Sequence, residues 1–319
     1  MISPQADPAV SPVAVFDRPL VRLRRQRALP RLAEHRFLYD EMAASLADRV
    51  ALLQRAFPVV AIAGDRGGAL REVLAPWLAE RKVIYLDTVL EGELERYPAA
   101  IADEEALPLA PESVDAVLSC GTLHWANDLP GAFIQMRRAL RPDGVMLAAM
   151  SGGETLAGLR QAMNGAELAV RGGVSPRLSP MADVRDMGGL LQRAGFALPV
   201  VDNDTLTVSY ENITALMRDL RGMGETNAVS NRDGRPLNAE MLAEASAQYP
   251  DRDTDGRLLA RFEMLFLTGW APAATQQQPL RPGSARHRLA DALRTEEHGT
   301  GDYVSVPHSK SSGIKGDDA

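Results

Sequence analysis

Two short apolar segments in the middle of the chain, residues 114–118 and 145–150, are almost uninterrupted by polar residues. Apolar runs of this length are typical of parallel strands that are covered on both faces of a sheet. Between them, residues 129–140 carry apolar side chains at helical spacing and predict a crossover helix. Such a unit crosses over right-handed, and its polar loops lie at the carboxyl ends of the strands. We therefore expect any ligand at residues 119–125 and 151–154.

A similar unit comes earlier in the chain. Residues 58–63 are apolar and predict the first buried strand, and a glycine-containing turn follows at 64–68. The backbone N–H groups of such a turn, at the start of a helix, form a cradle for a nucleotide-like or carboxylate ligand. The next strand ends at Asp87, twenty residues after Gly67. Two carboxylate oxygens at that distance suit the two hydroxyls of a ribose, and the alternative is an aspartate that caps the next helix.

The same patterns predict the remaining elements. Helical spacing or helix punctuation marks further helices at residues 37–55, 69–80, 156–171, 183–195, 212–223 and 237–248. A pair of strands is predicted at 198–201 and 205–209, with polar residues between them, and another strand at 262–267. Pro142, Asp143 and Gly144 predict a turn after the crossover helix, because proline resists helical continuation and glycine accepts turn conformations.

Composition and charge narrow the class of protein. With 319 residues, 45% hydrophobic and 24% charged, the chain has the composition of a soluble globular protein. A net charge of −7 argues against broad nucleic-acid binding, and no apolar run is long enough to span a membrane. The first residues lack a secretory pattern and Cys120 is the single cysteine, so we expect a cytoplasmic protein.

Arginines are dense in one N-terminal stretch. They stand at positions 18, 22, 24, 25, 27, 31 and 36. One interpretation is a helical region with a solvated basic face. The other is a docking surface for an acidic partner, which would also serve peripheral association with a membrane.

Several motifs resemble a known family. They are Phe-Asp-Arg at 16–18, Leu-Ala-Asp-Arg-Val at 46–50, Ala-Asp-Glu-Glu at 102–105, Leu-His-Trp-Ala-Asn-Asp-Leu-Pro at 123–130, Arg-Pro-Asp-Gly-Val at 141–145, Gly-Gly-Glu-Thr-Leu at 152–156 and Gly-Met-Gly-Glu-Thr-Asn at 222–227. The order of elements resembles the class I S-adenosylmethionine (SAM) methyltransferase fold, an α/β Rossmann-like sheet of seven strands with helices on both faces. The motifs together resemble the respiratory complex I assembly factor 5 family and its bacterial relatives.

The sequence predicts a domain plan. A composition rich in proline, alanine and serine predicts a disordered N-terminus at residues 1–14, and a change to proline, glutamine, serine, glycine and charged residues predicts a disordered tail at 271–319. The resemblance implies a methyltransferase-like domain at 15–270. Within the domain, N-terminal helices occupy 15–55, the cofactor-binding core 56–151, and the substrate half 152–270.

The resemblance also implies SAM as the cofactor. Asp87 would hold the ribose and Asp103 the adenine amino group, in a site completed by Ala63, Asp65, Gly67, Glu104 and Ser119. The glycine loop departs from the family pattern, since Ala61 stands at the usual acid, Ala63 at the first glycine and Asp65 at the second. A carboxylate at Asp65 would repel the methionine carboxylate of SAM unless a cation compensates.

The candidates for chemistry are few. His124 and Trp125 follow the fourth predicted strand and are candidate catalytic residues, the alternatives being a hydrogen-bonded loop histidine and a core or lid aromatic. We predict no metal site, because the histidines outside the tail are His35 and His124 and neither begins a His-x-Asp or His-x-Glu pair. Cys120 has no clear histidine partner and is interpreted as a small residue lining the site.

Three functions remain open at this stage. The resemblance implies a protein substrate, a subunit of NADH:quinone oxidoreductase (complex I), modified by arginine hydroxylation during assembly. The alternatives are a SAM-dependent methyltransferase acting on a small molecule or an acyl carrier, and a cofactor-free assembly chaperone.

Overall fold

A computed structural model describes residues 14–90, 98–276, 291 and 294–295. The described residues up to Ala274 form one compact unit, and the few described residues from Thr275 onward belong to a second. The predicted disorder of 1–14 falls, apart from Ala14, outside the described residues, as does that of most of the tail after 276.

A seven-stranded sheet forms the centre of the first unit, in the order β3-β2-β1-β4-β5-β7-β6. The strands are β1 (Val59–Asp65), β2 (Lys82–Asp87), β3 (Ala99–Ile101), β4 (Val114–Cys120), β5 (Leu140–Ser151), β6 (Ala197–Tyr210) and β7 (Leu258–Trp270). The first five run parallel, whereas β7 is antiparallel to both of its neighbours. The predicted α/β methyltransferase architecture, with one antiparallel strand brought in by the last hairpin, is confirmed.

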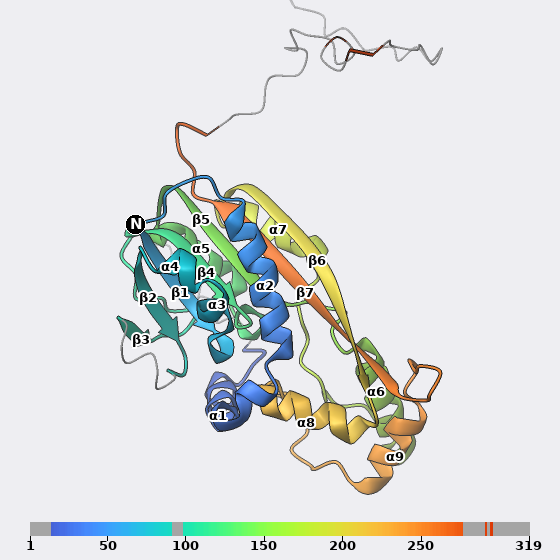
Figure 1. The fold of residues 1–319 in the computed structure, drawn as a ribbon. Coiled ribbons are helices and arrows are strands. Elements are labelled where there is room, and N and C mark those ends of the chain that lie inside the picture. Colours follow the sequence, from blue (N-terminus) through green and yellow to red (C-terminus); the bar gives the residue numbers. More distant parts are fainter. Residues whose placement is uncertain (1–13, 91–97, 277–290, 292–293, 296–319) are drawn as a thin grey trace, which may run out of the picture. The chain divides into compact units, whose positions relative to one another are not determined.

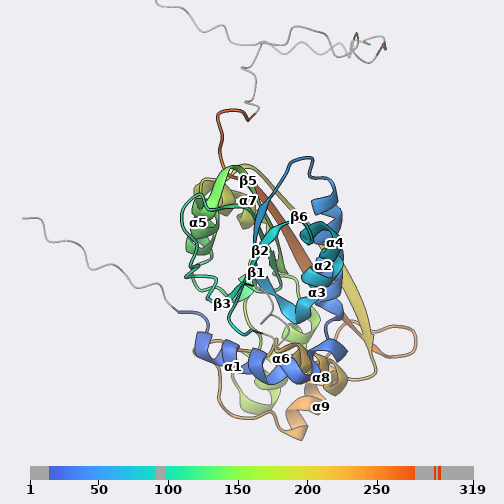
Figure 2. The ribbon, with the colours of Figure 1, turned by 60° about the vertical axis from the view of Figure 1, so that its left-hand side comes forward.

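Helices cover both faces of this sheet (Figures 1 and 2). One face carries α5 (Leu129–Ala139) and α7 (Val184–Arg193), and the other carries α2 (Phe37–Ala51), α3 (Ala69–Val73) and α4 (Ala75–Leu78). Two apolar cores result, because β4 and β5 point alternate side chains to opposite faces: Leu118 and Leu147 join one core, and Val117 and Met146 join the other.

The remaining helices gather at one end of the sheet, as Figure 1 shows. They are α1 (Arg18–Ala28), the 3₁₀ turn η1 (Leu29–Glu34), α6 (Ala157–Arg171), α8 (Ile213–Met223) and α9 (Ala239–Ala247). α6 packs against α9, and α1 packs against α8. None of the helices in the described part of the chain is long and apolar enough to cross a membrane.

Two sequence predictions about strands were wrong in detail. The pair predicted at 198–201 and 205–209 is the single strand β6, because its polar residues Asp202, Asn203 and Asp204 lie on an edge strand that pairs only with β7. The turn predicted at Pro142 to Gly144 belongs to β5, and Gly144 and Asp143 there exchange hydrogen bonds with Ala271.

The helix predicted at 69–80 is divided into α3 and α4, with a break at Leu74. Pro76 stands in the first turn of α4 and has no N–H group to continue the hydrogen bonding of α3. The Arg-rich stretch is helical, as expected, but it is not one basic face. Arg25 is fully buried and Arg18 is partly buried, whereas Arg22, Arg27 and Arg31 are exposed.

Candidate functional site

The N-terminal segment before α1 lies against the loop that follows β4. The backbone N–H of Phe16 donates a 2.7 Å hydrogen bond to Oδ1 of Asn127, and Nδ2 of Asn127 donates one of 3.1 Å to the carbonyl of Phe16. The ring of Phe16 meets that of Trp125 edge to face at 5.2 Å. The N–H of Asp17 donates to the carbonyl of Ala228 at 2.8 Å. The motifs at 16–18 and 123–130 therefore meet in one place, together with Ala228, which directly follows the motif at 222–227.

Arg18 connects the same segment to the loop after β3. Its Nη2 lies 2.6 Å from Oδ1 of Asp103 and also contacts Glu104, while Nη1 donates to the carbonyl of Trp125 at 2.9 Å. Burial by itself would lower the pKa of Arg18, but the two carboxylates raise it above its ordinary value. The acid predicted to hold an adenine amino group is thus paired with a guanidinium of the chain itself.

Arg25 and Arg66 are the two large cations inside this end of the sheet, and both are buried. Nη1 of Arg25 lies 3.4 Å from Oγ1 of Thr88 and 3.4 Å from Oε1 of Glu104, and its Nη2 donates to the carbonyl of Gly121 at 3.4 Å. Its guanidinium therefore lies between the ends of β2 and β4, where the resemblance places the adenosyl group.

Arg66 comes from the turn η2 (Arg66–Gly68) and points toward α8. Its Nη2 donates to the carbonyl of Met223 at 3.1 Å, and its guanidinium lies 5.8 Å from the ring centre of Tyr39. Gly67 next to it has a left-handed φ of +68°, which a glycine adopts without strain. The predicted glycine turn is therefore present, and the buried side chain of Arg66 lies beside it.

The carboxylate of Asp65 binds backbone N–H groups at the start of α3 (Ala69–Val73). Its Oδ1 accepts from the N–H of Leu70 at 2.9 Å and its Oδ2 from the N–H of Arg71 at 3.3 Å. The N–H groups at the start of α3, which would receive a ligand carboxylate, are thus satisfied by a carboxylate of the chain.

The other predicted cofactor residues lie at the same carboxyl end of the parallel strands. Asp87 accepts from the N–H of Asp65 at 3.2 Å and from the N–H of Val89 at 3.3 Å, so the carboxylate acts as a local cap. Ala63 and Ser119 are buried, and Oγ of Ser119 lies 3.2 Å from Oγ1 of Thr122. The structure places all seven predicted residues near the carboxyl ends of strands β1 to β4. Groups of the chain itself form hydrogen bonds with Asp65, Asp87 and Asp103.

Glu225 organises the side of the site nearest α8. Its Oε2 accepts from Nε1 of Trp125 at 2.7 Å and lies 2.9 Å from Nε2 of His124, while its Oε1 accepts from the hydroxyl of Tyr39 at 2.7 Å. Burial opposes this charge, but His124, Arg25 and the Tyr39 hydroxyl lower the pKa of Glu225 to about 2. The carboxylate is therefore ionised at neutral pH.

The same contacts define His124 and Trp125. Nδ1 of His124 is buried and has no hydrogen-bond partner among the described residues. Trp125 is 1% exposed, consistent with the expected core aromatic, yet its N–H binds a carboxylate. The η4 turn (Leu123–Trp125) thus places both candidate catalytic side chains on one acid.

Reasoning from the sequence missed Glu225, Arg25 and Tyr39 as members of this site. The signal for Glu225 was its place in the motif at 222–227, directly after Gly224. Cys120 lies under the site and is fully buried; burial, with lesser contributions from Asp65 and Asp40, raises the pKa of its thiol well above the ordinary value. That environment agrees with a packing role for Cys120 rather than a nucleophilic one.

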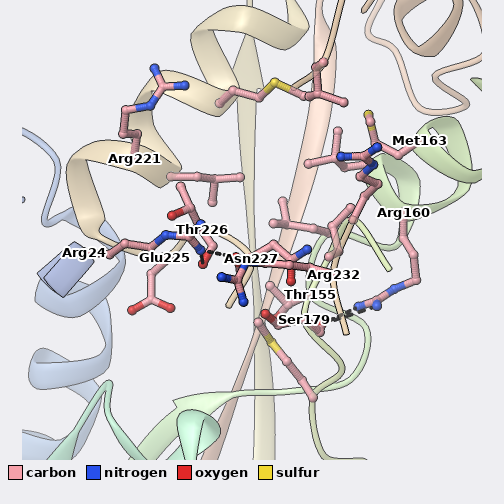
Figure 3. A pocket seen from close by; sticks show the side chains of 18 of the residues that line it. Arg24, Thr155, Arg160, Met163, Ser179, Arg221, Glu225, Thr226, Asn227 and Arg232 are labelled. Carbon is pink, nitrogen blue, oxygen red and sulfur yellow. Dashed lines mark hydrogen bonds between the residues drawn. The ribbon is translucent and has the colours of Figure 1, made fainter. Parts of the chain in front are cut away.

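A pocket of about 330 Å³ lies next to this network, between α6, α8 and the segment at 177–181. Trp125 and Glu225 line it, and so do arginines from three elements (Figure 3). No group of three or more histidine, cysteine or acidic side chains suited to a metal ion occurs among the described residues.

Known proteins resemble this chain at several levels. Residues 67–148 match the family described as a methyltransferase domain. The chain is 38% identical over 288 residues to the mitochondrial arginine-hydroxylase NDUFAF5 of Danio rerio, covering 87% of this chain and 89% of that protein. The human protein of the same name is 35% identical over 294 residues, covering 89% and 85%.

Other similarities are more distant. A malonyl-[acyl-carrier protein] O-methyltransferase of Laribacter hongkongensis is 32% identical over 284 residues, covering 84% of this chain and 94% of that protein. The solved structure of the YcgJ protein from Bacillus subtilis has a TM-score of 0.50 and 14% identity, covering 72% of this chain and 99% of that chain. At that identity the structure supports the fold alone.

The methyltransferase match supports SAM, the cofactor of that class, as the sequence predicted. Within the predicted cofactor region the guanidinium of Arg25 contacts Glu104, one of the residues predicted to hold the cofactor, and also Thr88 and Gly121.

Proposed function

The chain belongs to the family of the mitochondrial arginine-hydroxylase NDUFAF5, and from this we propose that it modifies a protein subunit during the assembly of NADH:quinone oxidoreductase. The finer form of the proposal is hydroxylation of an arginine on that subunit. The similarity extends over most of both chains, including the half after the matched methyltransferase domain.

One observation carries the proposal: four of the seven motifs that resemble this family, at 16–18, 102–105, 123–130 and 222–227, form a single contact network. Asp17 and Arg18 reach the segments at 228 and 103–104, and Trp125 reaches Glu225. Arg232 also contacts this network, because its Nη1 lies 3.3 Å from Oδ2 of Asp17. These contacts join segments outside the strands, so they are not required to form the sheet. We therefore assign the network to the activity.

The surface beside the network suits a protein partner. Arg27 and Arg31 in the α1–η1 region and Arg218 of α8 line a hollow of about 580 Å³ between the two elements. The clustering of cations on this face favours an acidic segment of the partner, because opposite potentials attract across an interface. This face is the exposed remainder of the Arg-rich stretch that the sequence singled out.

The chain's own groups have definable roles in this proposal. Glu225 stays ionised, so it holds the imidazole of His124 and the indole of Trp125 in fixed orientations. Hydroxylation would take its oxygen atom from an oxidant, whereas methylation would take its methyl group from bound SAM. The test is therefore made in cells, where every co-reactant is present.

The experiment deletes the gene and compares the mass of the partner subunit's arginine peptides with those of the parent strain. Loss of one oxygen from an arginine supports hydroxylation. Loss of a methylene-sized increment indicates a protein methyltransferase, and reduced complex without a mass change indicates a chaperone. Complementation with Glu225→Gln should fail to restore the modification, whereas the exposed control Glu211→Gln should restore it. Normal assembly with an unaltered subunit would refute the proposal.

A second candidate is a SAM-dependent methyltransferase that acts on an acyl carrier. The observation in its favour is the similarity to the malonyl-[acyl-carrier protein] O-methyltransferase, which spans 94% of that protein. Incubating the purified protein with radiolabelled SAM and malonyl carrier protein tests it directly. Labelled ester is the expected product of this second candidate.

A further inference from the structure

The pocket beside Glu225 has an apolar interior. Leu159 and Met163 of α6, Met217 and Leu220 of α8, and Leu178 and Leu237 from the loops line it. Its volume of about 330 Å³ is at the lower end of the range for small-molecule sites, on the order of 300–1,000 Å³. At about 30 Å³ for a group the size of water or methylene, it has room for roughly ten such groups.

Three arginines at this pocket make no salt bridge with any described residue: Arg24, Arg160 and Arg221. Nη1 of Arg24 donates to the carbonyls of Thr226, at 2.9 Å, and Asn227. Arg160 donates to the carbonyl of Ser179 at 3.3 and 3.4 Å. In Figure 3, Arg24 and Arg221 lie on one side of the pocket and Arg160 on the other.

The acids that line the pocket already have partners. Oδ2 of Asp233 lies 2.9 Å from both Arg171 and Arg177. Glu225 is held by His124, Trp125 and Tyr39. Among the described residues the pocket therefore combines satisfied carboxylates with three arginines that form no salt bridge, whereas Arg177 and Arg232 are paired with Asp233 and Asp17.

Burial makes this arrangement costly for two of the cations. It lowers the pKa of Arg160, with only partial compensation from Glu154. Burial, followed by repulsion from Arg232, lowers the pKa of Arg24, and Asp17 compensates in part. A negative group from outside would offset these costs, since a charged hydrogen bond is stronger than one to a carbonyl.

We propose that this pocket binds an amphipathic anion, an apolar chain of about ten carbons that ends in a carboxylate or a phosphate. The chain would occupy the apolar interior, and the head group would lie at Arg24 and Arg221. Both arginines also line the hollow between α1 and α8, so the head group would lie where the pocket meets that basic surface. This binding site goes beyond the proposed function and does not depend on it.

The test is calorimetric titration of the purified full chain with decanoate, decyl phosphate and decanol. We expect saturable binding of at least one anion, about tenfold or more tighter than that of decanol. The ratio of the two anions distinguishes a carboxylate ligand from a phosphate ligand. The double variant Arg24→Gln/Arg221→Gln should weaken the preferred anion about tenfold and leave decanol within about twofold.

Two further variants make the result specific. Arg138→Gln removes an exposed arginine on α5, outside the pocket lining, and should bind like the wild type. Met217→Trp should fill the interior and weaken all three compounds. Thermal unfolding of each variant checks that it is folded. Equal affinity for the anions and decanol, or equal weakening by Arg138→Gln, would overturn the proposal, and neither result bears on the peptide masses that test the proposed function.

Discussion

The indole N–H of Trp125 donates a 2.7 Å hydrogen bond to the carboxylate of Glu225, a residue one hundred positions later in the chain. Both side chains are almost removed from water, with Trp125 1% exposed and the side chain of Glu225 8% exposed. The bond therefore joins the loop after β4 to the segment after α8. The predictions that follow begin with this contact.

Replacing Glu225 by glutamine removes the charge but keeps the size of the side chain. His124, Trp125 and Tyr39 then lose a charged partner, and one of the donors faces an amide N–H₂ group instead. We expect the free energy of unfolding to fall by about 2 to 4 kcal/mol, because breaking a buried ionic network leaves polar groups unsatisfied. Urea unfolding measures it. The exposed Glu211→Gln should change stability by less than about 0.5 kcal/mol, and an equal effect of both variants would contradict the assignment.

The stability that Glu225 provides should depend on pH in a defined direction. Its pKa in the folded state is about 2, below the ordinary value of 4.5. A lowered pKa means that the contribution is fully present above about pH 4.5 and is lost as the pH falls through the folded-state value. The stability difference between wild type and Glu225→Gln should be fully present above about pH 5 and shrink progressively as the pH falls from about 4.5 to about 2. A difference that grows on acidification would mean the carboxylate is not stabilised by its partners.

Arg25→Ala should improve binding of an adenosyl ligand. The guanidinium of Arg25 lies between Thr88, Glu104 and Gly121, so a ligand there must first displace it. Removing it should tighten the binding of S-adenosylhomocysteine about tenfold, equivalent to about 1.4 kcal/mol, as measured by calorimetry. Arg27→Ala, on the exposed side of the same helix, is the control. Weaker binding in Arg25→Ala would show that Arg25 contacts the ligand.

Asp87→Ala should weaken the same ligand. Sequence position assigns the ribose hydroxyls to this carboxylate, and leaving them unpaired costs about 1 to 3 kcal/mol. Because Asp87 also accepts from the N–H groups of Asp65 and Val89, thermal unfolding must be recorded alongside calorimetry. Asp204→Ala on the exposed edge strand β6 serves as the control. An unchanged dissociation constant for Asp87→Ala would remove this residue from the site.

Cys120 should resist alkylation in the folded protein. Its side chain is fully buried and burial raises the pKa of the thiol, so little reactive thiolate is present at pH 8. Iodoacetamide should modify it at least about a hundredfold faster in denaturant than in buffer, followed by mass spectrometry. Rapid labelling without denaturant would identify Cys120 as an accessible nucleophile after all.

The sequence alone determined the central sheet. β1, β4 and β5 are apolar runs whose neighbours are turns and a helix of clear period, and such local patterns specify buried parallel strands without knowledge of distant contacts. It also placed Asp87 and Asp103 at the same end of the sheet, because the carboxyl ends of parallel strands lie on one side. Where a strand lies on the sheet edge, as β6 does, the apolar pattern weakens and the prediction divided it in two.

Only the tertiary structure decided how the site is filled. Arg25 and Arg22 both belong to one basic helix, yet one is fully buried and the other exposed. The difference arises because Arg25 meets Glu104, some eighty residues away, and periodicity carries no information about such a partner. Glu225 likewise became the centre of the site through His124, Trp125 and Tyr39, whose contacts exist only once α2, the loop after β4 and the segment after α8 have packed together.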